Sequence, residues 1–325
     1  MKKKLLAKFA IVALFGGCNV SIAQTSSAFP SRPIKLVVGF TAGASSDVVA
    51  RLVAQKLGEG LGQPISVDNK PGAGSSIGAD FVAKASPDGY TLLLATVANA
   101  INASLMPNLA FDMGKDFASI GLIASVPNLL VIHPSVPARS VKELIALGRQ
   151  APDRLMFASS GNGTGSHLAA ELFKSMADVK MTHVPYRGSP QAVTDLMAGR
   201  VSMLFSPTSS VLPHIKSGAL VALASTGAQR TSAAPELPTV AESGLPGYET
   251  SVWFGLMAPK GTPKDVIDRL NRELIKLNAD EKFKQQLTTQ GIDAKSSSSE
   301  QMTDYMQTEM MKWSQVVKSA GVKAD

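Results

Sequence analysis

The stretch "LVVGFTAGASSDVVARLVAQKL", residues 36–57, decides the fold class. It continues the apolar run "IKLVVGF" (34–40), which is typical of a strand buried on both faces. A loop of small residues follows, and apolar residues then recur at helical spacing between positions 48 and 61. A buried strand, a short loop and an amphipathic helix in this order predict the start of a parallel βαβ unit.

The same alternation continues along the chain. "ISVDN" (65–69) and "YTLLLAT" (90–96) predict two more strands, with a glycine-rich helix entry, "PGAGSSIGAD" (71–80), between them. After Pro134 the rhythm returns, with helices predicted over 140–150, 165–176 and 189–199 and strands between them. Residues 232–249 predict a long loop, 251–259 a strand, and 262–278 and 300–320 two closing helices.

The closing helices predict a discontinuous domain organisation. They have no strands of their own, so their apolar faces need the first sheet to cover. We therefore expect an α/β protein with two lobes, each a mostly parallel sheet flanked by helices. One lobe comprises 30–127 plus 257–325 and the other 128–256, with a hinge where the chain crosses near 125–134 and 251–259.

The first 23 residues predict a secretory signal peptide. A start with four lysines precedes the apolar run "FAIVALFGG" (9–17), and Ser21 and Ala23 occupy the small positions of a cleavage site. We expect a cut after Ala23 and a periplasmic mature chain. An alternative cut before Cys18 would give a lipoprotein, but Phe15 stands where such signals usually carry leucine.

Composition excludes several functional classes. Without residues 1–23 the chain keeps 28 basic and 25 acidic residues, and its only cysteine is gone. No basic cluster remains to predict binding to nucleic acid or to an anionic membrane, and we expect no stable membrane insertion. Disulfides and cysteine-ligated metals are excluded for the mature chain. The Walker, G-x-S-x-G and H-E-x-x-H patterns are absent, so we expect no cofactor, no metal and no catalytic residues.

Two loops of small residues predict an anion site. The first N–H groups of a helix lack intrahelical partners, and the helix dipole makes them an anion-binding end. In the first loop Ser46 is expected as N-cap and Asp47 as the residue that orders the first turn. "FASSGNGTGSHLAAELF" (157–173) repeats the design on the second lobe. Two such loops facing one cleft would clamp an anion.

Other candidates near these loops are less specific. His167 either donates to a ligand or caps its helix locally. Arg187 either pairs with a carboxylate or is an exposed turn residue.

The ordered motifs of the whole mature chain resemble one family. The segments "IKLVVGFTAGASSDVVARL", "DFASIGLIASVPNLLVIHPS", "VPYRGSPQAVTDLMAGRV" and "LPTVAESGLPGYE" are similar to those of the Bug-type receptors. These are the extracytoplasmic solute-binding proteins of tripartite tricarboxylate transporters. The resemblance implies a Venus-flytrap fold that holds a small carboxylate largely through backbone N–H groups and water.

The chain departs from the family pattern at three positions. Ala44 replaces the second glycine of the first loop, and Gly39 replaces a common proline. The family often carries histidine where this chain has Asn99. Together, the two loops, the position after the third strand and the less specific candidates give the residues expected to bind ligand. They are Phe40, Ala42, Gly43, Ala44, Ser45, Asp47, Asn99, Ser159, Gly163, Thr164, His167 and Arg187.

The functional prediction is a monomeric periplasmic binding protein that carries a small organic acid to tripartite transporter subunits in the membrane. The alternatives are a secreted hydrolase of small acids and a sensor subunit for a membrane signalling partner. A nucleophile–base pair would favour the hydrolase, and none is evident.

Overall fold

The computed structural model describes residues 29–106, 108–152, 154–186 and 188–322. The predicted signal peptide, its cleavage site and Cys18 lie outside these ranges. The first part of the chain forms β1 (Ile34–Val38), α1 (Ser45–Leu61), β2 (Ile65–Asn69), a short 3-10 turn (Ala73–Ser75), α2 (Ser76–Ala83), β3 (Thr91–Thr96) and α3 (Val97–Leu105).

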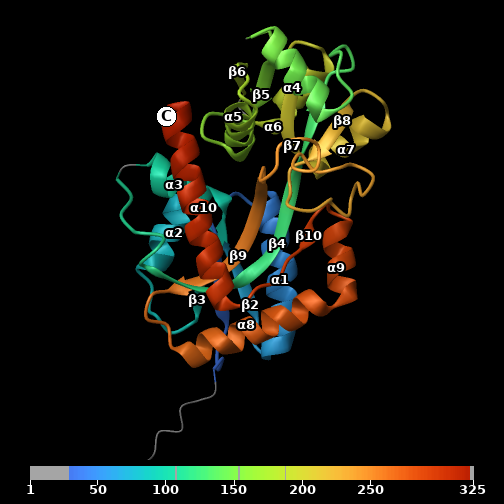
Figure 1. The fold of residues 1–325 in the computed structure, drawn as a ribbon. Coiled ribbons are helices and arrows are strands. Elements are labelled where there is room, and N and C mark those ends of the chain that lie inside the picture. The colour runs from blue at the N-terminus through green and yellow to red at the C-terminus, as the bar shows by residue number, and fades with distance from the viewer. Residues whose placement is uncertain (1–28, 107, 153, 187, 323–325) are drawn as a thin grey trace, which may run out of the picture.

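The middle of the chain builds the upper lobe of Figure 1. Its elements are β4 (Phe117–Ile132), α4 (Val141–Gln150), β5 (Met156–Ser159), α5 (Gly165–Ala177), β6 (Thr182–Pro185), α6 (Ser189–Met197), β7 (Met203–Pro207), α7 (Thr208–Lys216) and β8 (Val221–Ser225). The chain then returns to the lower lobe through β9 (Ser251–Pro259), α8 (Lys264–Ala279), α9 (Glu281–Thr288), β10 (Asp293–Ala294) and α10 (Ser299–Ala320).

The strands form two parallel groups joined by two antiparallel crossing strands. The order is β2-β1-β3-β9-β4-β7-β5-β6, with β8 and β10 also paired to β4. The pairs of β1 with β2 and β3, and of β5 with β6 and β7, are parallel. Among the described residues, β4 pairs with strands of both groups, antiparallel with β9 in the lower lobe and with β7 in the upper lobe, and β9 pairs antiparallel with β3 on its other side. This confirms the two-lobed α/β fold.

Each lobe has an apolar core on both faces of its sheet. In β1, Leu36 and Val38 pack toward α1 and α8, whereas Val37 packs on the other face with Met302 and Trp313 of α10. Successive side chains of a strand point to opposite faces, so an unbroken apolar run is needed when both faces are covered. The parallel strands lead into helices at their carboxyl ends, and this places the loops after β1 and β5 at the cleft between the lobes.

The last helix also contacts the upper lobe. Val316 and Val317 of α10 share an apolar cluster with Leu168 of α5, and Figure 1 shows α10 rising alongside α3 toward α5. The buried carboxylate of Glu309 joins this helix to β9, because its Oε2 accepts the indole N–H groups of Trp253 at 2.8 Å and Trp313 at 3.0 Å.

No helix in the described parts of the chain is long and apolar enough to cross a bilayer.

Candidate functional site

A cavity of about 440 Å³ lies between the two lobes. Its walls come from the amino-terminal ends of α1, α3 and α5, from the rest of α3 and from β9. The lining residues are Phe40, Ala44, Ser45, Ser46, Gly74, Thr96, Val97, Ala98, Ile101, Asn102, Leu105, Met106, Ser160, Asn162, Gly163, Thr164, Gly165, Val252 and Phe254. All of these side chains are uncharged.

The loop before α1 is held by Asp47. This buried carboxylate accepts the backbone N–H of Gly43 at 2.9 Å, the Asn69 amide at 3.0 Å and Arg51 Nε at 2.9 Å. The Arg51 hydrogen bond keeps the pKa of Asp47 below its ordinary value, although burial acts in the opposite direction. Gly43 has φ of +85°, a conformation that favours glycine.

The loop before α5 uses the same geometry with a different side chain. The N–H of Gly163, where φ is +68°, donates to His167 Nδ1 at 3.0 Å, again four residues along the chain. An accepting Nδ1 leaves the imidazole proton on Nε2, which lies 3.7 Å from a carboxylate oxygen of Glu171. His167 is buried and does not line the cavity, so its side chain holds the loop before the helix.

Because Asp47 and His167 occupy the glycine N–H groups, the next N–H groups of each helix are free to receive a ligand. Within the described residues, no acceptor lies within reach of the N–H groups of Ser45 and Ser46, or of Gly165 and Ser166. These are the positive ends of two helix dipoles on opposite lobes. Two such ends at one uncharged cavity suit an anion without the need for a charged side chain.

A stacked pair of histidines supports the second loop from below. The rings of His167 and His183 are 3.9 Å apart, and Phe157 stacks on His183 at 4.7 Å. His183 Nε2 lies 2.6 Å from the Ser159 hydroxyl. Burial, helped by the neighbouring His167, lowers the pKa of His183 to about 4.

The third helix end at the cavity is the amino terminus of α3, and a capping box of its own side chains forms hydrogen bonds there. The Thr96 hydroxyl accepts the N–H of Ala98, and Asn99 Oδ1 accepts the N–H of Thr96. The Asn99 amide also donates to the Ser75 hydroxyl, and the side chain is 1% exposed. Asn99 therefore faces away from the cavity, and Asn102 lines it instead.

Several expected site residues do line the cavity. They are Phe40, Ala44, Ser45, Gly163 and Thr164. Ala42 and Gly43 are exposed beside it, and Arg187 lies outside the described residues.

Four other expected residues do not reach the cavity. Asp47, Asn99, Ser159 and His167 are buried and hydrogen-bonded within the protein, so they support the site from behind. The prediction that Ser46 caps α1 is wrong, because the helix begins at Ser45 after Ala44, which has no capping oxygen.

The sequence prediction missed the α3 wall. Residues 97–105 form a helix whose side chains at 97, 98, 101, 102 and 105 line the cavity. These positions recur every three or four residues, and this spacing in the sequence indicates a helix with one face toward the cavity.

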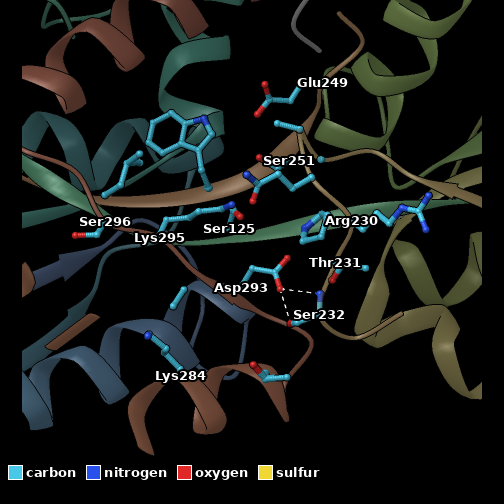
Figure 2. A pocket seen from close by; sticks show the side chains of 18 of the residues that line it. Ser125, Arg230, Thr231, Ser232, Glu249, Ser251, Lys284, Asp293, Lys295 and Ser296 are labelled. Carbon is cyan, nitrogen blue, oxygen red and sulfur yellow. Dashed lines mark hydrogen bonds between the residues drawn. The ribbon is translucent and has the colours of Figure 1, made fainter. Parts of the chain in front are cut away.

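A second cavity, of about 580 Å³, lies on the opposite side of the crossing strands. Along β9, Val252 and Phe254 line the first cavity, whereas Ser251 and Trp253 line the second. Figure 2 shows charges of both signs there, with Asp293 accepting hydrogen bonds from the N–H and hydroxyl of Ser232. This cavity is larger, but it lacks the converging helix ends that suit an anion.

A family model described as "Tripartite tricarboxylate transporter family receptor" matches residues 49–322. The chain belongs to this receptor family. The resemblance found in the sequence motifs is thereby confirmed.

Individual family members match over nearly their full lengths. Protein BugT of Bordetella pertussis is 35% identical over 317 residues, covering 97% of both chains. The structure "R. palustris Rpa4515 with adipate" is 37% identical with a TM-score of 0.75, covering 91% of this chain and 99% of that one. MatC from Rhodopseudomonas palustris, with bound malate, is 30% identical with a TM-score of 0.72, covering 89% and 100%.

Proposed function

We propose that this receptor captures a small carboxylate in the cavity between its lobes and delivers it to the membrane subunits of a tripartite tricarboxylate-type transporter. The observation that carries the proposal is the pair of helix ends on opposite lobes, each with free N–H groups at one uncharged cavity. A carboxylate bridging the two ends would satisfy donors on both lobes at once and so favour their closure. The adipate and malate held by two related receptors support the same ligand class.

A thermal-shift screen of mono-, di- and tricarboxylates against the purified mature protein tests this proposal. A ligand that binds only the folded state raises the free energy of unfolding by mass action, by about 2.7 kcal/mol at a hundredfold excess over Kd. The melting temperature rises with it. The matched control for each acid is the neutral analogue in which every carboxyl group is an amide, which has a similar shape and no charge. Shifts by amides or sugars alone would contradict carboxylate binding.

The proposed role is non-catalytic and periplasmic. Incubating the protein with its best ligand should return the compound unchanged by mass spectrometry; turnover would favour the hydrolase instead. Sequencing the amino terminus of protein from the periplasmic fraction should give Gln24 as the first residue. An acylated Cys18 would contradict the proposed cleavage.

A further inference from the structure

The polar side chains that line the cavity are mostly committed to the protein itself. The Asn102 amide nitrogen donates to the carbonyls of Ala73 and Gly74 and to the Ser76 hydroxyl. The Thr164 hydroxyl donates to the Gly161 carbonyl at 2.7 Å. A ligand oxygen placed in the cavity would therefore have to compete with existing hydrogen bonds for these donors.

Hydroxyl groups near the helix ends also form hydrogen bonds within the loops and caps of the protein. Ser160 Oγ lies 3.0 Å from Ser166 Oγ, which also accepts the backbone N–H of Ser160. Thr96 Oγ1 accepts the N–H of Ala98 as part of its capping box. The Ser45 and Ser46 hydroxyls lie at the α1 end, where the carboxylate itself would bind.

Apart from Asn162 of the second loop, the remaining walls are apolar. They consist of Phe40, Val97, Ile101, Leu105, Met106, Val252 and Phe254, contributed by the first loop, by α3 and by β9. Within the described lining there is no carboxylate to pair with a ligand ammonium group. Asp47, the nearest buried acid in the loop, already accepts three hydrogen bonds.

We infer that the ligand is a carboxylic acid whose body is an unsubstituted hydrocarbon, aliphatic or aromatic, and that the cavity selects against hydroxy acids and amino acids. This inference rests on the proposed function, because it takes the helix ends as the carboxylate site. A polar substituent on the ligand body would be removed from water without gaining a partner. Selectivity of this kind arises from leaving a buried polar group unpaired.

Isothermal titration with matched acids tests the inference. Succinate, malate and aspartate share a four-carbon skeleton and differ in carrying no substituent, a hydroxyl or an ammonium group. Glutarate, 2-hydroxyglutarate and glutamate, and the pair adipate and 2-aminoadipate, extend the comparison to longer chains. Within whichever series binds, we expect the unsubstituted acid to bind about tenfold tighter or more than its substituted partners.

The variant Val252→Thr supplies a matched test within the cavity wall. Threonine has nearly the shape of valine and adds one hydroxyl on β9, so the preference for succinate over malate, or for its longer analogue, should fall at least about threefold. Val252→Ala removes volume without adding a hydroxyl, and the preference should stay unchanged.

The outcomes separate the two proposals. If no carboxylate binds, either in these series or in the thermal-shift screen with aromatic acids included, the proposed function fails. If carboxylates bind but the hydroxy or amino acids bind as tightly as the unsubstituted ones, the proposed function stands and the inference about the ligand body is overturned. An equal change of preference in Val252→Thr and Val252→Ala would also overturn it.

Discussion

Replacing Gly163 with alanine should weaken ligand binding by obstructing the approach of the two lobes. A Cβ atom at Gly163 would lie 2.7 Å from Cδ2 of Leu105, which belongs to α3 on the other lobe. Ordinary carbon contacts are about 3.5–4.0 Å, so one side must give by about 1 Å. Leu105 can turn its terminal methyl away at a cost of about 0.5–1.5 kcal/mol, which corresponds to about two- to tenfold in Kd.

Gly43→Ala is the matched control on the opposite loop. Both glycines have positive φ, so alanine adds a backbone penalty of about 1–2 kcal/mol at either position. A Cβ atom at Gly43, however, would meet no atom within 4 Å. We expect both variants to lose similar thermal stability, and only Gly163→Ala to lose affinity in isothermal titration with the best carboxylate.

A double-mutant cycle with Leu105→Val isolates the contact. Shortening Leu105 removes the methyl group that the new Cβ atom would meet. The double variant should therefore recover about 0.5–1.5 kcal/mol of binding relative to the sum of the single changes. Equal affinity losses in Gly43→Ala and Gly163→Ala, or a coupling energy near zero, would refute the reasoning.

Three further changes test the supports of the site. Asp47→Asn should lower the free energy of unfolding at pH 7, and the difference should shrink below about pH 4 in urea melts, because a carboxylate with a lowered pKa loses its contribution as it protonates. His183 must stay neutral when folded, so the wild type should lose about 1–2 kcal/mol between pH 7.5 and 5 that His183→Gln does not lose; parallel profiles would contradict this. Glu309→Gln, followed by tryptophan fluorescence, should cost about 3 kcal/mol because it removes a buried charge that accepts two indole N–H groups and pairs with Lys312; a loss under about 1 kcal/mol would contradict that role.

The alternation of elements was predictable because the strands are buried on both faces. Short, nearly continuous apolar runs such as 34–40 and 251–259 are typical of strands covered on each side, and β9 begins and ends at the predicted residues. The long strand β4 was harder to predict. Pro127 interrupts its pattern, and a proline usually argues against a central strand, yet here it lies where β4 passes from one lobe to the other.

The sequence predicted the two loops that form the site, but it did not predict which side chains near them point into the cavity. The loops after β1 and β5 follow from the rule that ligands bind at the carboxyl ends of parallel strands. Helix α3 was missed because Ala98, Asn99, Asn102 and Ala103 dilute its apolar pattern. Asn99 and Asn102 are three residues apart, and only the capping box around Thr96 decides which one faces the cavity.

The contact between α10 and α5 gives the carboxyl-terminal helix a part in setting affinity. A receptor joined by the crossing strands alone would sample many lobe orientations, and each binding event would have to select the competent ones. Because α10 is fixed to β9 through Glu309 and also packs on α5, it narrows that ensemble before any ligand arrives. Loosening or tightening this helix would therefore tune affinity from outside the cavity, while leaving the choice of ligand to the cavity walls.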